Sequence, residues 1–176
     1  MVKVIICNGK PMAGKTTFQQ LCQKYAWDEE IIAIESTVTF VKDIAQQCGW
    51  DGTKTPRNRK FLSDLKDLLT EWDDVPFKKI AERVEYYANM EGGHFLFVDC
   101  REPKEIEKLK RAFNATTLLI RRETAESEET SNHADAEVLN YNYDVTIFNN
   151  TTLENLKNAA YTFMNKMREE DTKWFM

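Results

Sequence analysis

The fold is decided near the start of the chain by residues 2–16, VKVIICNGKPMAGKT. The apolar run from Val2 to Cys7 is rich in β-branched side chains, as is typical of a strand buried on both faces of a parallel sheet. Gly9 to Thr16 follow it and match the phosphate-loop pattern G-x-x-x-x-G-K-[ST]. The spacing of apolar residues from Phe18 to Tyr25 then predicts a helix. A strand, a glycine-rich loop and a helix in this order form a binding site for phosphate, because main-chain N–H groups and a helix N-terminus face the anion.

Four more apolar runs follow, separated by helical patterns. They are Ile31 to Ile34, Phe95 to Val98, Thr116 to Ile120 and Val145 to Phe148. Three helical patterns separate the run at residues 31–34 from the run at residues 95–98, which indicates an insertion at about residues 49–93. Thr55-Pro56 predicts the start of one inserted helix, and Thr151 with Glu154 predicts a capping box before the last helix of the chain. The alternation predicts a single α/β domain over residues 1–176, with a doubly wound, five-stranded parallel sheet.

Composition excludes several classes of protein. The 176 residues carry 24 Lys and Arg against 29 Asp and Glu, so no domain-wide basic field attracts a nucleic acid duplex. The four cysteines are scattered without a C-x-x-C pair, which predicts reduced thiols and argues against zinc. No apolar run approaches the ~18 residues of a membrane span, and the first run is too short for a signal peptide. We therefore expect a cytoplasmic protein with no membrane partner.

The residue types in the loop suit a magnesium-bound nucleotide. Lys15 can reach the β- and γ-phosphates, and the Thr16 hydroxyl can bind Mg²⁺. Asp99 ends the third apolar run, and we expect it to be the second magnesium ligand; alternatively, it caps the turn at Glu102-Pro103. The residues expected to bind the nucleotide are Gly9, Lys10, Pro11, Met12, Ala13, Gly14, Lys15, Thr16 and Thr17.

The class of enzyme follows by elimination. A GTPase would normally carry N-K-x-D, but the only Asn-Lys pair, at residues 165–166, is followed by Met167 and Arg168. A translocating ATPase is disfavoured by the size of the chain and by the lack of repeats. The sequence therefore predicts a small phosphotransferase that uses ATP and Mg²⁺.

Basic residues indicate where the phosphate acceptor binds. Lys54, Arg57, Arg59 and Lys60 gather at the start of an inserted helix, where cations oppose the helix dipole unless an anion is near. We expect at least one of these arginines to bind the acceptor; a solvated basic turn is the alternative. Arg101 follows Asp99 by two residues, at the strand ends where open α/β sheets bind ligands. Arg121 and Arg122 begin a loop at residues 121–136, which we expect to act as a lid that brings an arginine to the transferring phosphoryl group.

Several segments together resemble the adenylate-kinase-like branch of P-loop kinases, and most of all the deoxynucleoside monophosphate kinases. They are the loop at residues 9–16, DCREPKEI at 99–106, LLIRRE at 118–123, and SNHADAEVLNYNYDVTIFNN with TLENL at 131–156. The family pattern D-x-R-x-x-x-E corresponds to Asp99, Arg101 and Glu105. An H-x-S-E-like segment corresponds to His133 to Glu137, with Asp135 in place of the usual Ser, and D-x-x-I-x-N corresponds to Asp144, Ile147 and Asn149.

The resemblance implies a three-layer P-loop NTPase fold and transfer of the γ-phosphoryl group of ATP to a (deoxy)nucleoside monophosphate, in nucleotide metabolism. The attacking phosphate oxygen is already anionic, so no base is needed and catalysis falls to Lys15 and the arginines. We expect these arginines to be Arg101, Arg121 and Arg122. The protein would act as a monomer or a homodimer.

Two other functions stay open. A nucleoside or other small-alcohol kinase would need a base, and Glu35 after the second apolar run is the candidate; it could equally cap Ser36-Thr37. His133 could lie near an adenine ring or be structural. From a different class, the chain could be a nucleotide-binding regulatory module with little turnover.

Overall fold

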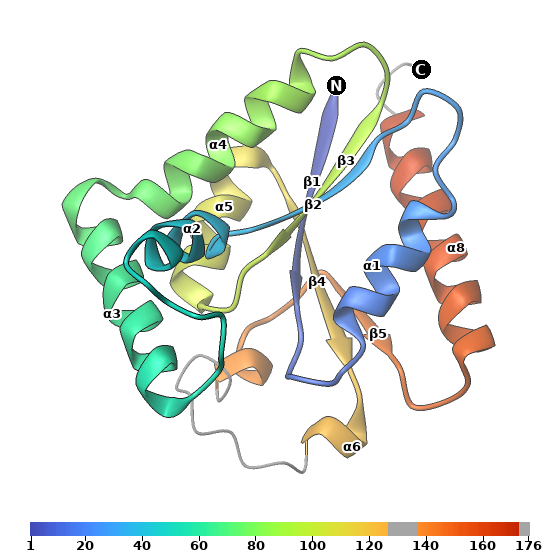
Figure 1. Ribbon diagram of the computed structural model, residues 1–176. Helices are drawn as coiled ribbons and strands as arrows, with labels where there is room; N and C mark the ends of the chain where they lie inside the picture. Colours follow the sequence, from blue (N-terminus) through green and yellow to red (C-terminus); the bar gives the residue numbers. More distant parts are fainter. Residues whose placement is uncertain (127–136, 173–176) are drawn as a thin grey trace.

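The computed structural model of the protein describes residues 1–126 and 137–172 and is built on a five-stranded parallel sheet, ordered β2-β3-β1-β4-β5 (Figure 1). Every pair of neighbouring strands is parallel. The strands are β1 (Val2–Asn8), β2 (Ile32–Ser36), β3 (His94–Asp99), β4 (Thr116–Arg121) and β5 (Val145–Phe148). All five predicted strands and the α/β fold class are confirmed.

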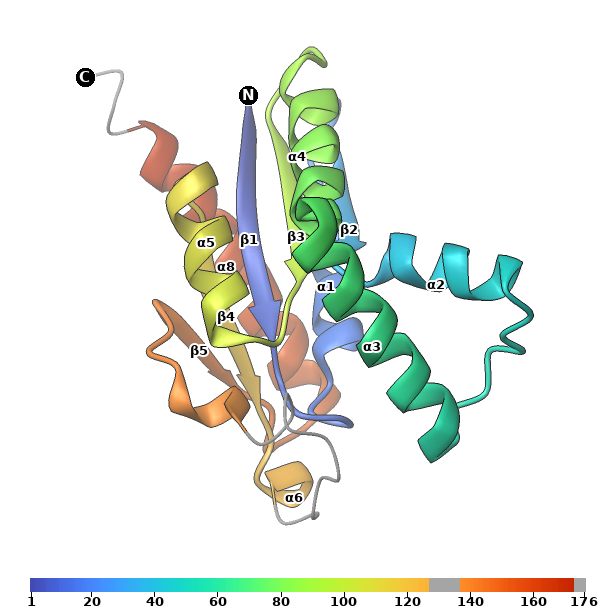
Figure 2. The ribbon, with the colours of Figure 1, turned by 90° about the vertical axis from the view of Figure 1, so that its left-hand side faces the viewer.

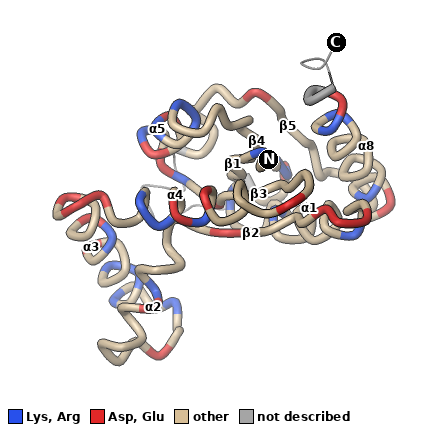
Figure 3. The backbone as a smooth tube through the Cα atoms, turned by 90° about the horizontal axis from the view of Figure 1, so that it is seen from above, with Lys and Arg blue, Asp and Glu red and all other residues tan. Residues whose placement is uncertain are grey.

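Helices cover both faces of the sheet (Figures 1 and 2). One face carries α1 (Lys15–Gln23) and α8 (Leu153–Thr172), and the other carries α4 (Val75–Ala88) and α5 (Pro103–Phe113). Two helices, α2 (Thr39–Gln47) and α3 (Pro56–Asp73), extend away from this body, and we call them the arm (Figures 2 and 3). The stretch expected as an insertion, residues 49–93, holds α3 and α4 but not α2. The short helices α6 (Glu123–Glu126) and η1 (Glu137–Asn140) lie between β4 and β5 in the chain.

The strands read as continuous apolar runs because both of their faces are buried. Along β1, Ile5 and Cys7 pack with α1 and α8, while Val4 and Ile6 pack with α4 and α5. Each of these four residues is at most 2% exposed. The sheet is therefore the middle layer between two hydrophobic cores.

The start of α3 agrees with the sequence, whereas the start of α8 differs from it. Thr55 Oγ1 accepts a hydrogen bond from the Asn58 N–H at 3.2 Å, so Thr55 caps α3 as predicted. At α8 the predicted capping box of Thr151 with Glu154 is wrong, because the residue that caps the helix lies one position later. Thr152 Oγ1 accepts from the Asn155 N–H at 3.3 Å.

The structure also bears on the cysteines and on membranes. All four cysteines are free thiols, three of them buried and Cys48 exposed. None of the helices in residues 1–126 and 137–172 has both the length and the hydropathy needed to cross a bilayer.

A buried ion pair joins α8 to the segment between α1 and β2. Arg168 and Glu30 form two hydrogen bonds, at 3.0 and 2.5 Å, and both side chains are 8% exposed. Arg168 also donates to the Tyr25 carbonyl at 2.7 Å, and its guanidinium lies 4.3 Å from the Trp27 ring. This single side chain therefore ties the end of α8 to the rest of the body.

We expect Arg168→Ala to lower the free energy of unfolding by about 3–5 kcal/mol, because it leaves the Glu30 carboxylate buried without its partner. Urea unfolding measures the loss. The matched control is Lys157→Ala on the same helix, whose exposed pair with Glu154 should contribute less than about 1 kcal/mol. Equal losses in the two variants would contradict this account.

Candidate phosphate-binding site

The loop between β1 and α1 has a backbone that depends on its glycines. Gly14 has a φ of 95°, where residues with a Cβ are strained, and a Cβ there would lie 2.4 Å from Asn149 Nδ2. At Gly9 a Cβ would lie 2.7 Å from the Ile120 carbonyl oxygen, so this glycine allows the loop to pass close to β4. Helix α1 begins directly after Gly14, at Lys15. The loop therefore ends in the N-terminus of a helix, which is the arrangement that binds phosphate.

Three polar side chains hold the loop in place: Asn8 at the end of β1, and Tyr143 and Asn149 from distant parts of the chain. Buried Asn8 accepts from the Gly9 N–H at 2.8 Å and donates to Tyr143 Oη at 2.7 Å. Burial raises the pKa of Tyr143, so its hydroxyl stays protonated and donates to the Val138 carbonyl at 3.0 Å. From the end of β5, Asn149 Nδ2 donates to the Ala13 carbonyl at 3.0 Å. The loop is thus anchored at both of its ends.

Asp99 lies beside the loop because of the strand register. In the pairing of β1 with β3, Cys7 is opposite Asp99, so both strands end at the same edge of the sheet. The Asp99 carboxylate forms an ion pair with Lys15 and accepts a hydrogen bond from Gln19 Nε2 at 2.7 Å. Its side chain therefore faces α1, and the alternative in which Asp99 caps the turn at residues 102–103 is wrong.

The sequence analysis missed Gln19, which is only 1% exposed. It follows Lys15 by one helical turn and donates to one Asp99 oxygen while Lys15 holds the other. One signal in the sequence could have indicated its role: Gln19 is a polar residue on the apolar face of a predicted helix, beside Phe18 and Cys22. A buried amide needs a hydrogen-bond partner, and here the partner is the Asp99 carboxylate at the end of β3. The sequence analysis also gave no role to Asn8 or Tyr143.

The residues at the start of α1 fit a magnesium ion bound together with a nucleotide. Thr16 is exposed, and the Asp99 side chain is 24% exposed. Within the described residues no group of three or more His, Cys, Asp or Glu side chains could hold a metal. Mg²⁺ usually takes only one or two protein ligands beside phosphate oxygens and waters. A hydroxyl and one carboxylate meet that requirement, so Thr16 and Asp99 are the residues that would hold the ion.

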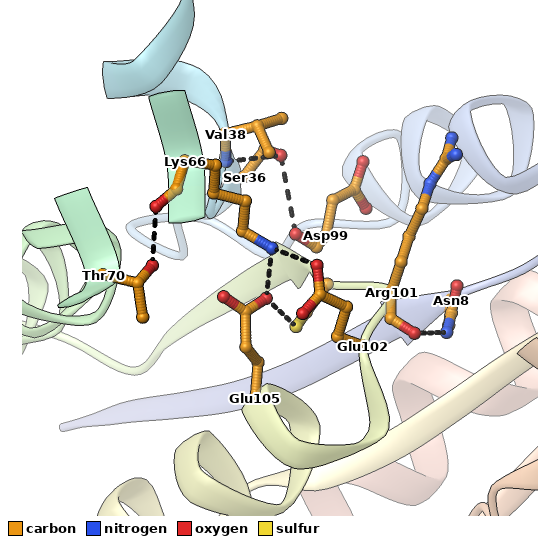
Figure 4. Close-up of polar contacts among 10 residues, drawn as sticks. Asn8, Ser36, Val38, Lys66, Thr70, Asp99, Arg101, Glu102 and Glu105 are labelled. Atoms are coloured by element: carbon orange, nitrogen blue, oxygen red, sulfur yellow. Dashed lines mark hydrogen bonds and ion pairs between the residues drawn. The ribbon is translucent and has the colours of Figure 1, made fainter. Parts of the chain in front are cut away.

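On the far side of Asp99 a buried lysine joins the arm to α5 (Figure 4). Lys66 of α3 donates to Glu102 at 2.8 Å and to Glu105 at 2.7 Å, and its side chain is 10% exposed. Burial alone would lower the pKa of Lys66, but the charges and hydrogen bonds of Glu105 and Glu102 hold it above its usual value. Lys66 therefore offsets one of the two negative charges that Glu102 and Glu105 carry at the edge of the site.

Arg101 follows Asp99 by two residues, just beyond the end of β3, and it is exposed. Its carbonyl accepts from Asn8 Nδ2 at 3.2 Å, which fixes its backbone beside the loop. In Figure 4 its side chain extends to the same side of the chain as that of Asp99, away from the Lys66 cluster. Lys66 binds both Glu102 and Glu105 and offsets one of their two negative charges.

The other predicted basic residues lie at the start of α3 and at the end of β4. Lys54, Arg57 and Arg59 lie at the start of α3, and Arg59 Nε donates to the Lys54 carbonyl at 3.1 Å, within the arm. Arg121 ends β4, with its guanidinium 5.5 Å from the Phe148 ring, and Arg122 follows it. Both therefore lie at the same sheet edge as the loop.

Two further candidates have different outcomes. Glu35 accepts a hydrogen bond from Arg83 Nε at 2.6 Å, and its side chain is 19% exposed. Its carboxylate is thus occupied by an ion pair with α4. His133 and the loop at residues 127–136 lie outside the described residues.

No protein-family model matches the chain, and no curated protein sequence matches it. Among solved structures, a mutant of the APS kinase of Mycobacterium tuberculosis has a TM-score of 0.46 and 11% sequence identity, and the match covers 94% of this chain and 96% of that chain. These comparisons identify no site residues, so the candidate site is described from the geometry of the loop alone.

We expect Lys66→Met to lower the free energy of unfolding by about 2–4 kcal/mol, because two neighbouring carboxylates lose their counter-charge. Glu102 is 44% exposed, so solvent screening keeps the loss below that of a fully buried pair. A double-mutant cycle with Glu105→Gln checks the cause, since adding this change to Lys66→Met should cost much less than it does alone. Strictly additive losses would show that the two residues do not interact.

Proposed function

We propose that this protein is an ATP-dependent P-loop kinase that transfers the γ-phosphoryl group of ATP to the phosphate of a (deoxy)nucleoside monophosphate. The observation that carries the proposal is the loop from Gly9 to Thr16, which runs from β1 into α1 with Lys15 beside Asp99. A lysine, a hydroxyl and a carboxylate at one helix N-terminus form a set of groups suited to a triphosphate and its magnesium ion.

The loop and the side chains beside it have separate tasks in this proposed reaction. The main-chain N–H groups up to Thr17 orient the phosphates, and the dipole of α1 adds to their field. Lys15 binds the oxygens of the transferring phosphoryl group. The Asp99 carboxylate competes with these oxygens for the Lys15 ammonium group. Gln19 keeps the Asp99 carboxylate turned toward the helix. Mg²⁺, held by Thr16 and Asp99, would supply charge neutralisation between the phosphates.

The acceptor is proposed to bind at the edge formed by Arg101. Its exposed side chain extends to the same side as Asp99, and Lys66 offsets one of the two negative charges of Glu102 and Glu105. A phosphate acceptor is favoured over an alcohol because the candidate base, Glu35, is ion-paired with Arg83. An anionic phosphate oxygen attacks without a base, so Arg101 and the rim arginines Arg121 and Arg122 need only to position it and balance its charge.

A panel of acceptors tests the proposal against its alternatives. The full chain is incubated with ATP, Mg²⁺ and either nucleoside monophosphates or nucleosides, and ADP formation is followed. ADP that appears only with a monophosphate supports the proposal. ADP that appears only with a nucleoside would favour a kinase with Glu35 as base, and tight nucleotide binding without acceptor-dependent turnover would favour a regulatory module.

We expect Lys15→Ala to lower the rate of transfer by about 100-fold or more, because the transferring phosphoryl group loses its main positive side chain. The circular dichroism spectrum should stay that of the wild type, since Lys15 acts on the ligand. Lys24→Ala, at the other end of α1, is the matched control and should keep full activity. Wild-type turnover in Lys15→Ala would remove the kinase proposal.

Arg101→Ala should raise KM for the monophosphate by about 10- to 100-fold, the usual value of a charge-assisted hydrogen bond, and should change KM for ATP little. Steady-state kinetics with each substrate varied in turn measures both constants. Arg111→Ala on α5 removes a guanidinium from an exposed pair with Glu107 and is the control. An effect confined to ATP would mean that the donor and acceptor sides are assigned the wrong way round.

A further inference from the structure

The side chain of Asn8 continues the pairing of β1 with β3 beyond the end of the sheet. The register of the two strands ends with Cys7 opposite Asp99. After this point β1 leads into the phosphate loop, and β3 leads to Arg101. Asn8 Oδ1 accepts from the Gly9 N–H at 2.8 Å, and Asn8 Nδ2 donates to the Arg101 carbonyl at 3.2 Å, the bond drawn in Figure 4. One side-chain amide thus connects the start of the loop to the backbone of Arg101, and we call this connection the Asn8 link.

The directions of the hydrogen bonds fix the orientation of the Asn8 amide. The Gly9 N–H can only donate, so it must face the amide oxygen. The two amide hydrogens then serve the Arg101 carbonyl and, at 2.7 Å, Tyr143 Oη. Tyr143 donates its own proton to the Val138 carbonyl at 3.0 Å. Every donor of the two side chains is therefore in use, and exchanging the amide oxygen and nitrogen would place a donor against the Gly9 N–H.

These groups are shielded from water. Asn8 and Val138 are 0% exposed, Gly9 is buried, and half-buried Tyr143 packs against the core shared with α4 and α5. A buried donor that loses its acceptor keeps the full cost of its desolvation. Removal of the Tyr143 hydroxyl would leave one Asn8 hydrogen without its acceptor, so it should loosen the amide and with it the Asn8 link.

We propose that Asn8 and Tyr143 are positioning residues, which hold the phosphate loop and the backbone of Arg101 at a fixed separation. This role rests on the proposed function, in which the loop binds ATP and Arg101 binds the acceptor phosphate. The two residues act on the distance and angle between the donor and acceptor phosphates, and a misplacement of about 1 Å can lower a rate by about 100-fold. Each substrate keeps its own binding groups when the Asn8 link loosens, so the loss should appear in kcat.

Removal of one hydroxyl tests this role, and a neighbouring tyrosine provides the matched control. Tyr143→Phe should lower kcat by about three- to tenfold and change KM for ATP and for the monophosphate by less than about twofold. Tyr141→Phe removes a similar hydroxyl, which donates to Glu107 on α5 at 2.8 Å, and should keep the wild-type kcat. Both variants lose one hydrogen bond, so their urea midpoints should fall by similar small amounts. Equal kcat values in the two variants would overturn the proposal.

Nuclear magnetic resonance of the Gly9 amide tests the Asn8 link without any activity measurement. Hydrogen exchange at the Gly9 N–H should be faster in Tyr143→Phe than in the wild type, and unchanged in Tyr141→Phe. Asn8→Ala removes the amide itself and should also shift the signal of the Arg101 carbonyl carbon. Wild-type exchange at Gly9 in Tyr143→Phe would overturn the proposal. A wild-type chain that shows these spectral changes between variants but transfers no phosphate would support the Asn8 link and remove the kinase proposal instead.

Discussion

The candidate site depends on the register between β1 and β3. Because Cys7 lies opposite Asp99, the strand that enters the phosphate loop and the strand that ends in the carboxylate finish at the same level. Lys15 and Gln19 then reach the two Asp99 oxygens from one side of α1. A shift of one residue would turn the Asp99 side chain to the opposite face of the sheet. Such a shift would also exchange the side chains that β1 and β3 contribute to the two close-packed cores, so the packing of these cores opposes it.

Much of the fold could be predicted because its signals are local. Continuous apolar runs predicted all five strands, and Thr55-Pro56 predicted the start of α3. The polar contacts that hold the site are not local. Asn8 and Tyr143 are 135 residues apart, and Lys66 reaches carboxylates 36 and 39 residues away. No periodicity in the sequence indicates which distant polar groups meet, so these partners could be assigned only from the structure.

The arm shows a second limit of prediction from local sequence patterns. Its helical pattern is correctly predicted from the sequence. In the structure one side of α3 faces the body through Lys66, while Leu68 and Trp72 stay largely exposed. Periodicity identifies an apolar face but does not indicate whether that face is covered by the same chain. The charged residue at the contact with the body and the apolar residues in solvent reverse the usual expectation for an amphipathic helix.

The bond from Asn149 to the Ala13 carbonyl has a consequence for synthesis of the protein on the ribosome. The loop near the N-terminus emerges early, but the side chain that anchors it belongs to a strand made 136 residues later. Tyr143, which anchors Asn8 at the other end of the loop, is also translated late. A nascent chain therefore carries the whole loop sequence for most of translation without the contacts that hold its shape. Only after the last strand has joined the sheet can the loop acquire its final geometry.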